Sequence, residues 1–306
     1  MDFVLDTNES AEGVPGIIVT PHTTAAKVTL TNMEIGRMEP RSHFKGYLRR
    51  NLRAYKAARW LYRVLGPFSF PNPLTVIREY YAFFKDLRSY RLLASAEAIN
   101  WTDLYPYVSD KTAGTPINLS YFYQDTWAAG KIFAAHPRLH LDIGSTALLV
   151  GILARFTRVC SFDIRPLMVK LDGLEPCSGS ILALPFKDHS IESLSSLCVL
   201  EHIGLGRYGD SLEPRGTDLA AAEMQRVLGP NGDLYVSVPI ELSSKVYFNA
   251  HRAFTLEGFL KKFPELTLVE GRLIQNGKEY SLEAIKDIDF SRYEVVALLH
   301  LRRLQE

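Results

Sequence analysis

Residues 139–156, LHLDIGSTALLVGILARF, decide the fold of this chain. An apolar run ends at Asp142-Ile143-Gly144, and the next residues, Ser145 and Thr146, are of the types that cap helices. A buried strand, a glycine turn and a helix in this order are typical of a βα unit whose first helical N–H groups face a ligand. Because the loop holds a single glycine, the stretch on its own also fits a core strand that merely turns at that residue.

The composition is that of an ordinary globular protein. Of 306 residues, 47% are apolar and 23% are charged, and the formal net charge of +1 predicts no nucleic-acid partner. The N-terminal MDFVLDTNES lacks the basic and apolar regions of a secretion signal, and the longest apolar stretch, near 146–154, is too short to span a membrane. The three cysteines have neither zinc nor CxxC spacing. We therefore expect a cytoplasmic protein with reduced thiols.

Three regions follow one another along the chain. Residues 1–45 show no helical period and predict a loosely structured arm, residues 46–117 predict a helical N-terminal region, and residues 118–306 predict an α/β domain. In the second region, GYLRRNLRAYKAARWLYRVLG (46–66) predicts an amphipathic helix with a basic face. That face is either solvated, or it contacts anionic lipid at a membrane surface or a phosphate-bearing substrate. The oligomeric state is left open.

Strands and helices alternate in the third region, which favours an open α/β sheet with helices on both faces. Two helices precede the alternation: FPNPLTVIREYYAFFKDLRSYRLLA follows a proline-rich stop, and LSYFYQDTWAAGKIFAAHPR ends at His136-Pro137. The strands are then expected at 139–144, 158–163, 178–182, 191–199, 232–239, 266–274 and 294–301. The helices are expected at about 147–156, 166–172, 217–228 and 255–263.

A carboxylate ends the second predicted strand, in VCSFDIRP. Asp163 lies about 20 residues after Asp142, where a ribose-binding acid is found in nucleotide-binding sheets. A carboxylate suits that position because it accepts hydrogen bonds from both ribose hydroxyls. The alternative is a solvated charge at the end of a strand, and the combination with Gly144 favours the nucleotide site.

Four segments in order carry a resemblance: LDIGS, FDIRP, ALPFKDHSIESLSSLCVLEH and QRVLGPNGDLYVSVP. Over residues 120–301 the chain resembles class I S-adenosylmethionine-dependent methyltransferases. YFYQDTWAAGKI, SSLCVLEHIGLGRYGD and FNAHRAF are further similar to an uncharacterised, domain-of-unknown-function branch of that fold. The resemblance implies a Rossmann-like seven-stranded sheet whose last strand is antiparallel, here preceded by the N-terminal helical extension, and S-adenosylmethionine as cofactor.

The resemblance also implies the cofactor-binding residues. Asp142, Gly144 and Ser145 would hold the methionine end, and Asp163 the ribose. Ile164, Ser180, Ile181 and Leu182 would surround the adenine, and Cys198 to Glu201 would flank the sulfonium. The chain departs from the usual GxGxG at Thr146 and Leu148, and Ser180 stands where most relatives carry an acid.

Candidate catalytic residues follow the fourth and fifth predicted strands. Methyl transfer to an alcohol needs alignment and a base. We expect His202 to be that base, with His251 second and Glu201 beside them, because a neutral imidazole accepts a proton near neutral pH. The acceptor would contact four residues of the same rim: Arg207, Tyr208, Asp210 and Arg252. The two arginines suit an anionic acceptor. The spacing of the acids and histidines is not diagnostic of a metal, so none is predicted.

The sequence thus predicts a methyltransferase that acts on a hydroxyl of a sugar, a glycan or another small-molecule acceptor. Aromatic residues near the site would suit such rings: Tyr121, Phe122, Tyr123, Trp127, Tyr208 and Phe248. The alternative is a catalytically inactive, methyltransferase-like binding or scaffold protein, which the missing glycines favour. A nicotinamide-dependent oxidoreductase is disfavoured by the final pair of strands, which ends the chain without another helix.

Overall fold

The computed structural model describes residues 73–93, 96–108, 110–111, 113–290 and 293–304. The predicted arm (1–45) and the predicted basic helix (46–66) lie outside these residues. The expected contact of the basic helix with lipid therefore also concerns residues outside the described part. The chain divides into two compact units, Thr23–Pro116 and a second unit that contains Ile117–Glu306.

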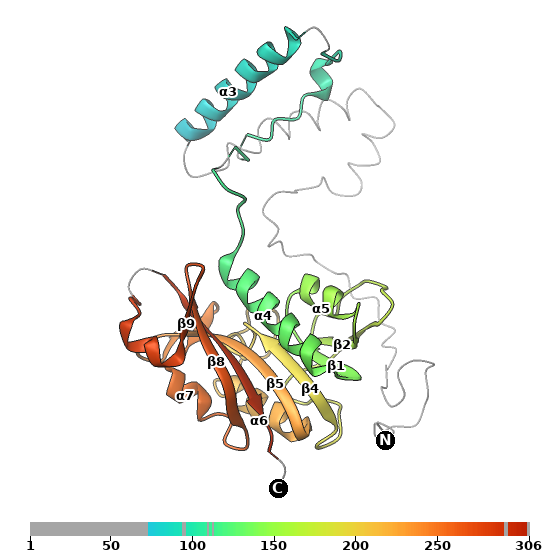
Figure 1. Ribbon diagram of the computed structural model, residues 1–306, viewed down its shortest axis with the longest axis vertical. Helices are drawn as coiled ribbons and strands as arrows, with labels where there is room; N and C mark the ends of the chain where they lie inside the picture. The colour runs from blue at the N-terminus through green and yellow to red at the C-terminus, as the bar shows by residue number, and fades with distance from the viewer. Residues whose placement is uncertain (1–72, 94–95, 109, 112, 291–292, 305–306) are drawn as a thin grey trace. The chain divides into compact units, whose positions relative to one another are not determined.

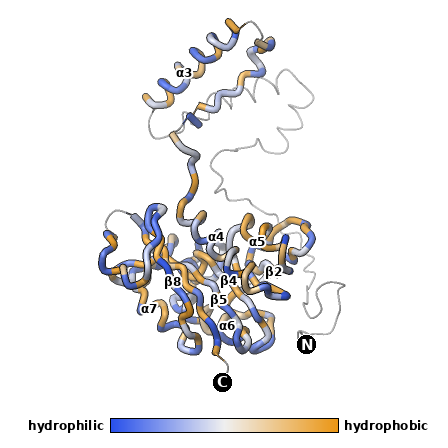
Figure 2. The backbone as a smooth tube through the Cα atoms, viewed as in Figure 1, coloured by the Kyte–Doolittle hydropathy of each residue, from blue (hydrophilic) through white to orange (hydrophobic). Residues whose placement is uncertain are grey.

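The described part of the first unit contains α3 (Pro73–Arg91) and the short 3-10 helix η2 (Trp101–Asp103), shown in Figure 1. The helix predicted after the proline-rich stop is therefore confirmed, and it starts at Pro73, because proline is tolerated in the first turn. Val76 and Tyr80 are buried against Val108. Apolar and polar residues alternate along α3 (Figure 2).

The second unit is built on an eight-stranded sheet of order β3-β2-β1-β4-β5-β10-β8-β9. The strands are β1 (Leu139–Ile143), β2 (Arg158–Asp163), β3 (Leu174–Ser178), β4 (Ile191–Leu197), β5 (Leu228–Ile240), β8 (Thr267–Gln275), β9 (Lys278–Ser281) and β10 (Val295–Arg302). β1 to β5 pair in parallel, and β10 is antiparallel to both of its neighbours. This arrangement confirms the predicted fold class, with its late antiparallel strand.

Helices cover both faces of the sheet, as predicted (Figure 1). They are α4 (Leu119–Ala135), α5 (Ala147–Leu153), α6 (Gly216–Val227) and α7 (Leu256–Leu260). α4 and α5 pack on one face through Ile132, Val150 and Leu153, and α6 and α7 pack on the other through Met224 and Phe259. These side chains are essentially inaccessible to solvent, so burial of apolar surface holds the layers together.

Two predicted elements of the second unit were wrong in place or type. The strand expected at 178–182 lies at β3, because Gly173 turns the chain earlier with a φ of +85°. A Cβ at Gly173 would lie 2.6 Å from the carbonyl oxygen of Ala154, so only glycine fits there. The helix expected at 166–172 does not form: the Asp163 carboxylate accepts a hydrogen bond from the Arg165 N–H, and Pro166 follows in an irregular segment.

Further strands were not predicted. β8 turns into β9 through Asn276-Gly277, both with positive φ, which is the usual sequence of a tight hairpin turn. β6 (Lys245–Tyr247) and β7 (His251–Ala253) form a separate two-stranded sheet. β5 also starts before 232, because Gly229 to Gly232 form an irregularity within the strand rather than a turn ahead of it.

Candidate functional site

A cavity of about 350 Å³ lies beyond the carboxyl ends of β1, β2, β3 and β4. Its volume is in the range of small-molecule sites, and this edge is where open α/β sheets bind ligands. Among the predicted site residues, the cavity is lined by Gly144, Ser145, Asp163, Ile164, Ser180, Ile181, Leu182, Cys198, His202, Tyr208 and Asp210. The structure therefore brings together residues from four separate segments of the sequence.

The loop between β1 and α5 contains one glycine, Gly144. Gly144 has a φ of +69°, and a Cβ there would lie 3.2 Å from the Val199 methyl groups. Thr146 caps α5: its Oγ1 accepts a hydrogen bond from the Leu149 N–H and donates one to Asp125. At the next motif position, Thr146 therefore serves as a helix cap in place of a glycine.

Asp142 lies beneath the cavity rather than in its wall. It is fully buried, accepts hydrogen bonds from the Ser145 N–H (3.1 Å) and the Ser195 hydroxyl (2.5 Å), and so fixes the loop. Burial raises its pKa to about 6. His140 links Ser195 to Ser193, with 2.8 Å at each ring nitrogen, and burial lowers its pKa to about 3. Because Ser195 gives its hydrogen to Asp142, the neutral ring donates from Nε2 to Ser195 and accepts at Nδ1 from Ser193.

Asp163 ends β2 at the cavity. One carboxylate oxygen accepts a hydrogen bond from the Arg165 N–H (2.7 Å), while Oδ2 is hydrogen-bonded to none of the described residues. The backbone N–H of Gly179 donates to the Asp163 carbonyl, and a Cβ at Gly179 would collide with the Phe162 ring at 2.3 Å. Ser180 accepts a hydrogen bond from the Leu182 N–H and thereby shapes the neighbouring turn.

Polar groups from α4 reach the end of β4. Cys198 has a φ of +53°, and its thiol donates to the Gln124 side-chain oxygen, which also accepts from Ser237. Burial raises the pKa of Cys198 well above its usual value, so it stays a thiol. Tyr121 lines the cavity, and burial raises its pKa to about 12. All three cysteines are free, as expected. Gln124 was not predicted, although a glutamine on the apolar face of a helix is a signal that could have been read.

Glu201 and His202 form a buried pair beside the cavity. Glu201 is 3% exposed, and burial raises its pKa to about 8. Its Oε2 meets no hydrogen-bond partner among the described residues, and its Oε1 lies 3.7 Å from Nε2 of His202. Nδ1 of His202 donates to the Ala250 carbonyl (2.7 Å), and burial lowers the pKa of His202 to about 4. At neutral pH the pair is therefore a protonated acid next to a neutral imidazole with a lone pair on Nε2.

The β6–β7 sheet brings His251 to this pair. The N–H of Arg252 donates to the Glu201 carbonyl (2.8 Å), and the rings of His251 and His202 lie 6.5 Å apart. The Arg252 guanidinium is buried and donates to the carbonyls of Ile203, Glu213 and Pro214. It therefore positions the loop after β4, and the structure does not bring it to the cavity wall.

The loop after β4 is organised around Asp210. Its carboxylate accepts hydrogen bonds from the N–H groups of Gly204, Gly206 and Tyr208, so Asp210 shapes the loop at the cavity. Arg207 donates to the Ala250 carbonyl (3.0 Å) behind the lining residues. The aromatic residues predicted near the site lie in three different places. Tyr121 and Tyr208 line the cavity, Tyr123 and Trp127 pack on the sheet, and Phe122 and Phe248 are mostly exposed.

Arg165 is a cavity residue that sequence reasoning missed. Its guanidinium carbon lies 4.2 Å from the centre of the Tyr208 ring. The signal was its place two residues after Asp163, directly beyond the end of β2. Among the described residues, no group of three or more histidine, cysteine or acidic side chains could hold a metal ion. In the same part of the chain, no helix combines the length and the apolar character that crossing a membrane requires.

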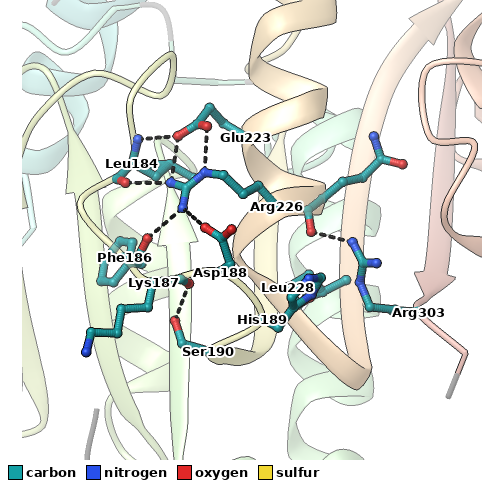
Figure 3. Close-up of polar contacts among 11 residues, drawn as sticks. Leu184, Phe186, Lys187, Asp188, His189, Ser190, Glu223, Arg226, Leu228 and Arg303 are labelled. Atoms are coloured by element: carbon teal, nitrogen blue, oxygen red, sulfur yellow. Dashed lines mark hydrogen bonds and ion pairs between the residues drawn. The ribbon is translucent and has the colours of Figure 1, made fainter. Parts of the chain in front are cut away.

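Arg226 joins two of the segments that carried the sequence resemblance (Figure 3). It forms ion pairs with Glu223 on its own helix and with Asp188, and it donates to the carbonyls of Leu184 and Phe186. Glu223 in turn accepts from the Leu184 N–H (2.7 Å). These contacts raise the pKa of Arg226 and lower that of Glu223. The network fastens the loop before β4 to α6, where β4 and β5 begin, and none of its residues lines the cavity.

Strand order, antiparallel β10 and cavity position together define a Rossmann-like α/β domain with the class I methyltransferase fold. The family model described as "Caenorhabditis protein of unknown function, DUF268" matches residues 186–258, which include the loop after β4 and the β6–β7 sheet. No curated protein sequence matches the chain.

Three solved structures illustrate what the chain is similar to. N-methyltransferase NodS from Bradyrhizobium japonicum WM9 is 16% identical, with 61% of this chain and 98% of that chain covered and a TM-score of 0.45. The 1,6-didemethyltoxoflavin-N1-methyltransferase of Burkholderia thailandensis, with bound S-adenosylhomocysteine, is 14% identical, with coverage of 60% and 79% and a TM-score of 0.42. The [4+2]-cyclase SpnF is 15% identical, with coverage of 60% and 81% and a TM-score of 0.45. Similarity at this level describes the fold, not the reaction.

Proposed function

We propose that this chain is an S-adenosylmethionine-dependent methyltransferase that acts on a hydroxyl of a sugar, a glycan or another small-molecule acceptor. The observation that carries the proposal is the cavity at the strand ends, where Gly144 and the Asp163 carboxylate face each other. A Cβ at Gly144 would approach Oδ2 of Asp163 to 3.4 Å, so the glycine keeps space open in front of that oxygen.

The lining residues fit the cofactor in chemistry and in order. Asp163 offers a free carboxylate oxygen for ribose hydroxyls, and Ile164, Ile181 and Leu182 offer apolar surface for an adenine. Gly144 and Ser145 would hold the methionine end, on a loop that Asp142 fixes from below. The Ser180 hydroxyl oxygen accepts a hydrogen bond from the Leu182 N–H, so its hydrogen remains free to be donated to a ring nitrogen of the adenine. When bound, S-adenosylmethionine supplies a methyl group on a positively charged sulfur.

His202 is the group best placed to take the proton of the acceptor hydroxyl. The Ala250 carbonyl holds Nδ1–H, which leaves the Nε2 lone pair as the acceptor. The low pKa of the ring keeps it unprotonated at neutral pH. Glu201, which is protonated at neutral pH, lies 3.7 Å from Nε2 and would keep the imidazole in place as it takes the proton. His251 lies behind His202 and is the second candidate.

Calorimetric titration with S-adenosylhomocysteine tests the cofactor. We expect binding, and we expect Asp163→Ala to weaken it by about 1–3 kcal/mol, because hydrogen bonds to a charged group are lost. Asp172→Ala, in the loop before β3 and away from the cavity lining, is a matched control. No heat with the wild-type chain would favour the alternative of a methyltransferase-like binding or scaffold protein. If the ligand binds, incubating the chain with radiolabelled methyl donor and glycan fractions would identify the acceptor.

A further inference from the structure

Two guanidinium groups share one aromatic ring at the cavity. The guanidinium carbon of Arg165 lies 4.2 Å from the centre of the Tyr208 ring, and that of Arg207 lies 5.0 Å from it. Arg165 follows β2, whereas Arg207 and Tyr208 follow β4. The ring of His202 meets Tyr208 edge-on at 5.5 Å. Positive charge is therefore concentrated next to the proposed base.

The donors of Arg165 remain available to a ligand. Stacking uses the flat face of a guanidinium and leaves its N–H groups free in the plane of the group. The Arg165 side chain lines the cavity and makes no hydrogen bond or ion pair with the residues that the structure describes. Arg207 donates to the Ala250 carbonyl and lies outside the lining, so it adds charge and orients the ring.

Arg165 and Arg207 form no ion pair with the acidic side chains that the structure describes, and Asp163, which lines the same cavity, accepts the Arg165 backbone N–H. The Asp210 carboxylate accepts three backbone N–H bonds from its own loop, and Glu201 is protonated at neutral pH. Arg252, the second arginine expected to bind an acceptor, is committed to backbone carbonyls. A positively charged sulfonium would add to the same field. An acceptor with a negative charge is favoured at this end of the cavity.

We propose that the acceptor carries a carboxylate or phosphate group, which Arg165 grips while its guanidinium rests on Tyr208, and that its hydroxyl lies next to His202. The acceptor class is thus an acidic sugar or another hydroxylated anion. This inference rests on the proposed function, since it names the acceptor of the same site. It replaces Arg252 with Arg165 as the residue that contacts the anion.

The test uses the full chain saturated with S-adenosylhomocysteine, and the probes are glucuronate, inorganic phosphate and uncharged glucose. Binding of each probe is followed through the arginine side-chain NMR signals, with and without S-adenosylhomocysteine. We expect an anion to bind, about tenfold more weakly to Arg165→Gln, and a smaller loss in Arg207→Gln. Arg158→Gln, at the opposite end of β2, is the matched control and should bind as the wild type does.

The outcomes separate the inference from the proposed function. Stronger binding of glucuronate than of phosphate identifies a carboxylate acceptor, and the reverse identifies a phosphate. If neither anion binds, if glucose binds equally well, or if Arg165→Gln and Arg158→Gln behave alike, the inference is overturned. Binding of S-adenosylhomocysteine in the same samples would still support the methyltransferase. A failure of that ligand to bind would overturn the proposed function itself.

Discussion

Replacing Glu201 with glutamine should remove a pH-dependent loss of stability. The carboxyl group is 3% exposed, and one of its oxygens lacks a partner among the described residues. Ionising it in place is unfavourable, because desolvation penalises the charge. Glutamine has nearly the same shape as the protonated acid but cannot ionise. Glu201→Gln should therefore fold as the wild type does and differ from it only where Glu201 titrates.

The sign and size follow from the raised pKa. Glu201 titrates near its ordinary value of 4.5 in the unfolded chain but at about 8 in the fold, so the folded chain holds an extra proton between these values. Stability then falls as pH rises through this window, by about 5 kcal/mol in all. His202, with its pKa lowered from 6.5 to about 4, acts in the opposite sense, but only below pH 6.5. Between pH 6.5 and 8 His202 no longer opposes the Glu201 contribution, which amounts to about 2 kcal/mol.

Thermal unfolding of both proteins from pH 6.5 to 8 measures this contribution. The wild-type melting temperature should fall relative to that of Glu201→Gln by about 4–8 °C, since a domain of this size shifts by about 2–4 °C per kcal/mol. Glu265→Gln, at an exposed site, controls for the loss of one glutamate. Parallel curves for wild type and Glu201→Gln would refute the reasoning, because they would mean that Glu201 is already ionised at neutral pH.

Three further substitutions test the site. Ser195→Ala removes the hydroxyl that donates to buried Asp142 and should destabilise the fold by about 1–3 kcal/mol, measured by urea unfolding; an unchanged midpoint would contradict the network. Gly144→Ala places a methyl group 3.2 Å from Val199 at positive φ, and should weaken binding of S-adenosylhomocysteine by about tenfold in calorimetry; equal affinity would show that the close approach is unimportant. His202→Ala should lower the turnover of methyl transfer while leaving that affinity nearly intact; full turnover would move the proposed base to His251.

Much of the fold was predictable because it depends on local patterns. β1, β2 and β4 are short, almost continuously buried runs, and α4 buries Gln124, Ala128 and Ile132 at helical spacing. The errors fall where single residues override the pattern. Gly173 moved β3 towards the N-terminus, because its backbone turns where other residues cannot. Asn276-Gly277, a strong hairpin signal, was overlooked and added β9 to the sheet.

The site was predictable only where it follows strand ends. Gly144 and Asp163 come directly after β1 and β2, so topology alone brings them to one edge. The roles of side chains in the loop after β4 depend instead on hydrogen bonds between residues far apart in the sequence. Arg252 turned inward to the Ile203 carbonyl, and no sequence pattern indicates such a contact.

The glycine-poor loop shows why a motif is weaker evidence than the geometry that it encodes. The glycines of GxGxG matter where backbone must approach a ligand or another strand, and of the three motif positions this chain keeps a glycine only at Gly144. Thr146 replaces the next glycine with a helix cap, held by Asp125 on α4. Burial raises the pKa of Asp125, and the hydrogen bond from Thr146 opposes that shift by stabilising the carboxylate. A substitution that breaks the motif therefore adds a tie between α4 and α5, and the cavity beside it stays open.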